Sequence, residues 1–141
     1  MARHTIHHAV LQAFLRSPTG GVARNMLRRG LKVESAAKRN LAGANGRPRR
    51  IDTGQTRASV NTRLLLVRGL PTARVGTPLR RARWIHDGTG IYGPRHTRIV
   101  PRRARFLRFK PKGLRRYIYV RSVKGMPANP FLADALPAAK D

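Results

Sequence analysis

VARNMLRRGLKVESAAKRNLA, residues 22–42, carries the strongest helical pattern in the chain. Apolar or small residues recur along one face at the spacing of a helix: Val22, Met26, Gly30, Val33, Ala37 and Leu41. Most of the cations fall outside this face, and Glu34 and Lys38 are spaced for an ion pair one turn apart. Gly43, followed by Asn45-Gly46, is expected to end the helix. The stretch predicts a long helix with one buried face.

The residues before this helix form a separate short pattern. Ile6, Val10 and Phe14 share one helical stripe, and Ser17-Pro18 ends it. We expect residues 1–18 to form an N-terminal arm or docking helix. Residues 19–141 are expected to form a single domain.

Two hairpins are predicted after the long helix. Residues 60–68 and 72–76 are expected to be strands joined by a turn at 69–71. Residues 104–109 and 116–123 flank Pro111-Lys112-Gly113, and the high β-propensity on both faces of 117–120 predicts that both faces are covered.

Short helical pieces and a long loop complete the pattern. Thr77-Pro78 is expected to cap and start a helix that Gly88 ends, and Asn129-Pro130 to start a terminal helix over 131–136. Residues 86–103 lack periodicity and are expected to be a long assembly loop. The predicted fold is α+β, with a long N-terminal helix packed on an antiparallel sheet of two hairpins and a short C-terminal helix.

The charge balance restricts the possible partners. The 141 residues include 31 Lys and Arg against 5 Asp and Glu, a formal net charge of +26. A compact chain of this charge repels itself, so an anionic partner or a packed assembly that neutralises part of the field is expected. Nucleic acid and acidic protein surfaces are the first candidates.

The same composition argues against an enzyme. The five carboxylates are scattered along the chain, whereas paired-carboxylate hydrolysis and divalent metal sites need carboxylates grouped together. There is no cysteine, and His4 and His8 have no third metal ligand near them in the sequence. We therefore expect no catalytic site, no cofactor and no bound metal. The longest aliphatic run, residues 64–67, is far short of the roughly 20 residues that cross a bilayer, so no membrane partner is expected.

Two short motifs match catalytic or cofactor-binding patterns only superficially. Asp52-Thr53-Gly54 matches the aspartic-protease triplet, but nearby arginines would keep the carboxylate ionised, and a helix N-cap is the better interpretation. Residues 88–93 read GxGxxG, yet Pro94 follows where a dinucleotide site needs a helix, and no acid follows at the required distance. A turned or flexible loop is favoured.

The capping interpretation of Asp52 gives a first prediction. Asp52→Asn keeps a capping oxygen and should change stability little, whereas Asp52→Ala should lower the free energy of unfolding by about 1 kcal/mol. Urea unfolding of both variants measures this difference. A stably folded asparagine variant that loses all function would contradict a purely structural role.

Aromatic and basic residues leave two interpretations open. Trp84, Tyr92, Tyr117 and Tyr119 lie among arginines and could stack on bases, although packing in a core or interface explains them equally well. Arginines cluster at 47–50, 80–83 and 102–108. Arg47, Arg49 and Arg50, on a loop that no apolar pattern ties to the core, are the predicted DNA-facing set, with Arg24 and Arg28 of the long helix as a second set.

Three stretches taken together resemble the tail-completion or head-tail joining (neck) family of long-tailed phages. They are IDTGQTRASV at 51–60, Val75-Gly76-Thr77 leading to WIHDGTG at 84–90, and VKGMPANPFL at 123–132. The resemblance spans residues 22–136 in the family's order: a long helix, D-T-G-x-x-R-x-S, V-G-T, an aromatic-aliphatic pair before G-T, and P-F-L. The chain departs from the family at Thr56, where an aliphatic residue is common, and in the arginine-rich segment before Gly88.

The resemblance implies a non-enzymatic virion protein, assembled in the host cytoplasm, that forms a ring in the neck as a tail terminator or tail-completion protein. The implied partners are further copies in a hexameric ring, neighbouring neck proteins, the tail tube protein, and double-stranded DNA passing through the lumen. Carried over to this chain, Asp52 and Gly54 are structural. The assembly or packing positions are Trp84, Ile85, Asp87, Gly88, Thr89, Gly90, Pro130, Phe131 and Leu132. A small basic RNA- or DNA-binding protein of ribosomal type is the alternative, and a nuclease is the third possibility.

Overall fold

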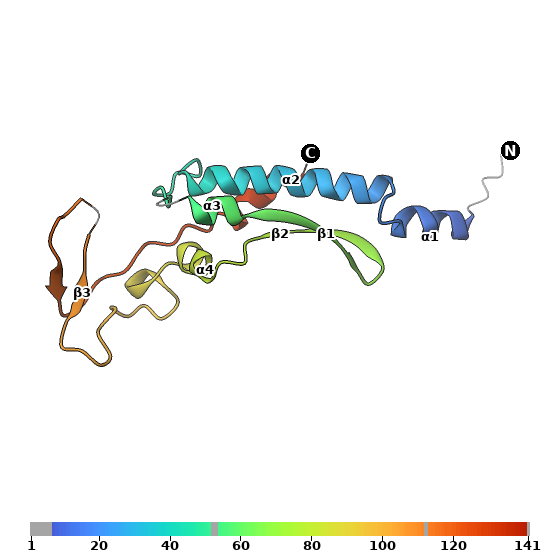
Figure 1. Ribbon diagram of the computed structural model, residues 1–141. Helices are drawn as coiled ribbons and strands as arrows, with labels where there is room; N and C mark the ends of the chain where they lie inside the picture. Colours follow the sequence, from blue (N-terminus) through green and yellow to red (C-terminus); the bar gives the residue numbers. More distant parts are fainter. Residues whose placement is uncertain (1–6, 52–53, 112, 141) are drawn as a thin grey trace. The chain divides into compact units, whose positions relative to one another are not determined.

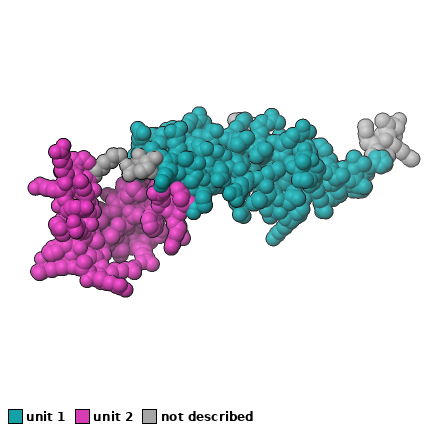
Figure 2. Space-filling model, in the orientation of Figure 1, with its two compact units in different colours: residues 1–78, 131–141 teal, residues 79–130 magenta. Residues whose placement is uncertain are grey.

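The computed structural model describes residues 7–51, 54–111 and 113–140. The chain forms two compact units, residues 1–78 with 131–141, and residues 79–130 (Figure 2). The single domain expected over 19–141 is thus distributed over both units. Each described unit contains one two-stranded antiparallel sheet. The α+β class is confirmed, and the two predicted hairpins form two separate sheets.

Helix α2, Gly21–Leu41, is the centre of the first unit and lies along the hairpin of β1 (Asn61–Val67) and β2 (Leu70–Gly76) (Figure 1). The predicted apolar face is confirmed, since its members are buried or half-buried: Val22, Met26, Gly30, Val33, Ala37 and Leu41. A Cβ atom on Gly30 would lie 2.6 Å from Thr62 Cγ2 and 3.0 Å from Ala73 Cβ. The glycine therefore allows the helix to approach the sheet closely.

The turn of this hairpin spans residues 68–69, where 69–71 was predicted. Arg68 (φ 53°) and Gly69 (φ 76°) form a two-residue turn, and Leu70 and Pro71 belong to β2. Positive φ at both central residues matches the right-handed twist of the strands. Because the Val67–Leu70 pair closes the turn, the adjacent pair that contains Pro71 is not hydrogen-bonded, and the proline costs no ladder bond.

The remaining helices of the first unit are short. Helix α1, His8–Arg16, precedes α2, and α3 spans Gln55–Ser59. The predicted short C-terminal helix is present as a 3-10 helix, η2, but it spans Ala133–Ala139 where 131–136 was expected, and Pro137 lies inside it. Lys140 N–H donates to the Pro137 carbonyl (3.1 Å), so Pro137 begins a second turn, a position where its missing N–H is not needed.

The second unit begins with α4, Arg80–Asp87, followed by the 3-10 turn η1, Gly90–Tyr92. Leu79 occupies the N-cap position, so the predicted Thr77-Pro78 cap is wrong, whereas Gly88 (φ 78°) ends the helix as predicted. The second hairpin is shorter than predicted, with β3 at Leu107–Phe109 and β4 at Ile118–Val120.

The expectation that both faces of this second hairpin are covered is also wrong. Tyr117 is 51% exposed and Tyr119 is 61% exposed. Tyrosine favours strands without requiring burial on both sides, so β-propensity alone does not establish that a face is covered.

Candidate functional site

Two of the stretches that carry the phage-neck resemblance meet in the second unit. Thr89 N–H donates to the Met126 carbonyl (2.9 Å), and Met126 N–H donates to Thr89 Oγ1 (2.9 Å). Ile91 N–H donates to the Lys124 carbonyl (2.8 Å), and Asn129 N–H donates to the Ile85 carbonyl (2.8 Å). Segments 85–91 and 124–129 therefore form one hydrogen-bonded element, called here the interlocked loop.

Glycines make this close approach possible. Gly90 has φ 65° and Gly125 has φ 93°, a region that side chains rarely adopt. A Cβ atom on Gly90 would overlap the Lys124 carbonyl oxygen, and one on Gly125 would overlap the Thr89 carbonyl oxygen. The GxGxxG stretch is thus a tightly packed backbone element, which agrees with a turned loop.

A small charged cluster lies at the end of α4. His86 Nδ1 is 2.8 Å from Asp87 Oδ1, and Arg83 Nε donates to Asp87 Oδ2 at 3.3 Å. The hydrogen bond from His86, assisted by Arg83, lowers the pKa of Asp87. The carboxylate is therefore ionised near neutral pH and orients the two side chains that precede it on the helix.

The structure divides the predicted assembly residues into exposed and internal positions. Trp84 is 58% exposed on α4. Ile85, Asp87, Thr89 and Gly90 are half-buried, and Gly88 is buried. Only the Trp84 side chain offers a large free surface, whereas the other positions shape the interlocked loop.

Phe131 and Leu132 of the P-F-L stretch pack within the first unit. Phe131 is fully buried, and Pro130 and Leu132 are half-buried. Asn40 Nδ2, on the buried face of α2, donates to the Phe131 carbonyl (3.1 Å). Of the two roles carried over for this stretch, packing fits the buried phenyl ring, since a buried side chain cannot reach a neighbouring subunit.

The first stretch also has a structural contact. Ser59 Oγ lies 2.6 Å from Thr77 Oγ1, which joins the end of the D-T-G-x-x-R-x-S segment to the V-G-T segment. Gly54 (φ 77°) occupies the N-cap position of α3. The prediction that Asp52 is the N-cap is therefore wrong in position, and Asp52 itself lies outside the described residues.

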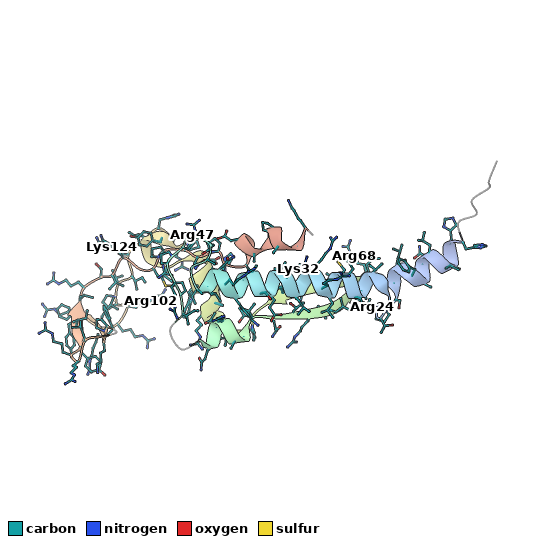
Figure 3. All side chains as sticks on the ribbon, turned by 90° about the horizontal axis from the view of Figure 1, so that it is seen from above. Arg24, Lys32, Arg47, Arg68, Arg102 and Lys124 are labelled. Atoms are coloured by element: carbon teal, nitrogen blue, oxygen red, sulfur yellow. The ribbon has the colours of Figure 1, made fainter. Side chains whose placement is uncertain are left out.

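The predicted DNA-facing arginines are mostly accessible. Arg47, Arg49, Arg24 and Arg28 are exposed. Arg50 is half-buried, and its backbone N–H donates to the Leu41 carbonyl (2.9 Å), which ties this end of the loop to α2. Figure 3 shows Arg24, Lys32 and Arg47 among the side chains of the first unit. Their contact with DNA stays a prediction.

Among the described residues of the first unit, large apolar side chains are exposed at several places, three of them on α1, the β1–β2 hairpin and α2. No side chain of α1 is buried, and Val10 is 68% exposed. The tip of the β1–β2 hairpin exposes Leu66 and Leu70, and α2 exposes Leu31 on its outer face. We call these three places the uncovered apolar faces. An apolar helix stripe without a covering surface is typical of a segment that docks onto another chain.

Sequence reasoning noted the arginine cluster at 102–108 and the tyrosines at 117 and 119, but not that the β3–β4 ribbon brings Arg108 beside both tyrosines. Arg108 pairs with Tyr119, and the guanidinium of Arg108 lies 4.0 Å from the centre of the Tyr117 ring. Cations and aromatic residues alternate at a spacing of two residues through both strands, which is a visible signal. Only the strand register, which pairs Arg108 with Tyr119, shows that residues from the two strands lie on the same side.

Comparison with protein-family models, with curated proteins and with solved structures finds no match to this chain. Within residues 7–51, 54–111 and 113–140, no group of three or more His, Cys, Asp or Glu side chains could hold a metal ion. In the same part of the chain, no helix has both the length and the apolar character needed to cross a bilayer.

Proposed function

We propose that the protein is a structural subunit of a phage neck, which forms a ring that joins the DNA-filled head to the tail tube as a tail terminator or tail-completion protein. The observation that carries the proposal is the set of uncovered apolar faces. A folded protein buries such side chains where it has a surface to receive them, because each large side chain contributes about 1.5–3 kcal/mol when buried. Further copies and neighbouring neck and tail tube proteins would supply that surface.

The arrangement of the resemblance motifs supports the same function. Ser59 is joined to Thr77, the interlocked loop joins segments 85–91 and 124–129, and Phe131 is buried. The motif residues thus maintain the fold. Exposed positions such as Trp84 are then available for contacts with neighbours.

The proposed ring is a closed hexamer held by heterologous contacts. In such a ring one face of a subunit contacts a different face of the next, and the rotation closes the assembly. The uncovered apolar faces lie on different elements of the first unit, as heterologous contacts require. The charge of +26 is neutralised in part by DNA in the lumen and in part by acidic neighbouring proteins.

Removal of the N-terminal helix tests this role. Deleting residues 1–16 should weaken assembly tenfold or more and leave the rest folded, because losing one buried large side chain costs about 1.5–3 kcal/mol and about 1.4 kcal/mol is tenfold in affinity. Analytical ultracentrifugation measures assembly, and virion yield measures function. An unchanged virion yield would contradict the proposal.

A matched pair of substitutions separates the apolar stripe from the presence of the helix. Phe14→Asp places a charge on the exposed apolar side of α1, whereas Gln12→Asp adds the same charge at a polar position. We expect the Phe14 variant to lose assembly and the Gln12 variant to keep it. Equal loss in both variants would mean that added charge alone prevents assembly.

A small basic nucleic-acid-binding protein of ribosomal type is the second candidate. The exposed cations of the β3–β4 ribbon favour it, since basic surface alone is sufficient for such a role. Sizing of the purified protein separates the two candidates: the alternative requires a monomer or dimer, and the neck protein requires a ring or stable complexes with its neighbours.

A further inference from the structure

The β3–β4 ribbon and the residues that adjoin its strand ends carry a group of exposed basic and aromatic side chains. The Arg108–Tyr119 pair places these two side chains on the same side of the ribbon. The guanidinium of Arg108 also lies over the Tyr117 ring, just before β4. Phe106, Lys110 and Arg121 directly adjoin the ends of the two strands. All of these side chains are exposed: Phe106, Arg108, Lys110, Tyr117, Tyr119 and Arg121. We call this surface the arm face.

The opposite side of the ribbon has a different character. It carries Leu107, Ile118 and Val120, all half-buried, together with Phe109. The ribbon is therefore two-sided, with an aliphatic side that is partly covered and a basic side that is open. The side chains around the ribbon are drawn in Figure 3, near the labelled Arg102.

No carboxylate balances the arm face along the chain. Residues 88–133 contain twelve Arg and Lys residues and no Asp or Glu. Arg102, Arg103, Arg105, Arg115 and Arg116 flank the arm face and are exposed. A surface of one sign at this density attracts a polyanion strongly.

We propose that the arm face binds double-stranded DNA through its backbone phosphates, without reading the base sequence. Guanidinium, ammonium and tyrosine hydroxyl groups all donate hydrogen bonds to phosphate oxygens. Arg108, Lys110 and Arg121 supply the charge, and Tyr119 supplies an exposed hydroxyl. The partner is thus recognised by its regularly spaced negative charge.

The aromatic contacts favour a duplex over a single strand. A single strand binds by stacking its bases on free aromatic rings. On the arm face Arg108 lies over Tyr117, and Arg105 lies 5.6 Å from the centre of the Phe106 ring. These rings already hold guanidinium groups, which orients the arginines and reduces the ring surface open to bases.

The charge distribution favours DNA over an acidic protein. Stable protein interfaces have a central region from which charged residues are depleted. The arm face has no such centre, because cations lie at Arg108 on β3, at Lys110 directly after β3 and at Arg121 directly after β4. Phosphates along a duplex match this distribution.

The inference rests on the proposed neck function only for the choice of double-stranded DNA as partner. DNA affinity and ring formation are measured in separate experiments. Loss of one without the other therefore shows which proposal has failed.

The test compares two triple variants of the full-length protein. Arg108→Gln/Lys110→Gln/Arg121→Gln alters the arm face, and Arg63→Gln/Arg68→Gln/Arg74→Gln removes the same charge from exposed positions of the β1–β2 hairpin. Binding to a short labelled DNA duplex of mixed sequence is followed by fluorescence anisotropy over a series of salt concentrations. The slope of log affinity against log salt falls by about 0.9 for each phosphate that the protein no longer neutralises.

We expect the arm-face variant to lower that slope by about 2.7 and the hairpin variant to leave it nearly unchanged. Equal decreases in both variants would overturn the proposal, because net charge alone would then explain them. Tighter binding of a single strand of equal length, or equally effective competition by polyglutamate, would also overturn it. The conservative variant Arg108→Lys/Arg121→Lys retains the charge and should retain the slope, and circular dichroism checks that the glutamine variant is folded.

Discussion

Gly90→Ala is expected to lower the stability of the second unit by about 3–5 kcal/mol. A left-handed backbone costs a residue with a Cβ atom about 1–2 kcal/mol. The new methyl group would also overlap the Lys124 carbonyl oxygen, which accepts a hydrogen bond from Ile91 N–H. Relief of the overlap separates segments 85–91 and 124–129, and each broken backbone hydrogen bond costs about 1 kcal/mol more.

Trp84 makes this effect measurable, because it is the only tryptophan in the chain and lies in the second unit. Its fluorescence during urea unfolding reports on that unit. Gly113→Ala is the matched control: Gly113 has φ 91°, and a Cβ atom there would have nothing within 4 Å. The control should cost only the backbone strain of about 1–2 kcal/mol. An equal loss of unfolding free energy in the Gly90 and Gly113 variants would contradict the close backbone packing of the interlocked loop.

Phe131→Ala is expected to lower the free energy of unfolding of the first unit by about 3–5 kcal/mol. Phe131 is fully buried, so its removal leaves a cavity and also forfeits the transfer energy of the ring. The helical circular dichroism signal during urea unfolding measures the change, because α2 of this unit is the longest helix among the described residues.

Leu136→Ala, in η2, is the control for this substitution. Leu136 is 63% exposed, and truncation of an exposed side chain usually changes stability by less than about 0.5 kcal/mol. A small effect at Phe131, comparable with that at Leu136, would show that the P-F-L stretch is not part of the core. It would instead favour the subunit-contact role.

The parts of the fold that depend on local pattern could be predicted. The buried face of α2 follows from a spacing visible in residues 22–41, and Gly88 ends α4 as expected. The α+β class and two hairpins followed from the order of such patterns. The turn at Arg68 could not be placed, because a non-glycine residue with positive φ is uncommon and composition does not indicate it.

The parts that depend on contacts distant in the sequence could not be predicted. The bond between Thr89 and Met126 joins residues 37 positions apart, and no local pattern indicates that they meet. The arm face likewise could be recognised only from the strand register, in which Arg108 lies opposite Tyr119. The arginine loop at 47–50 was visible in the sequence because its charges are contiguous, whereas the arm face draws on two strands.

The oligomeric state of the purified full-length protein tests the central proposal most directly. Native mass spectrometry gives the number of copies, and negative-stain electron microscopy of the same sample shows whether they close into a ring. We expect a closed hexamer, alone or with its neck neighbours, that is lost on deletion of residues 1–16. A protein that stays monomeric at every concentration, with and without those neighbours, while it still binds DNA would contradict a neck ring and favour a basic nucleic-acid-binding protein.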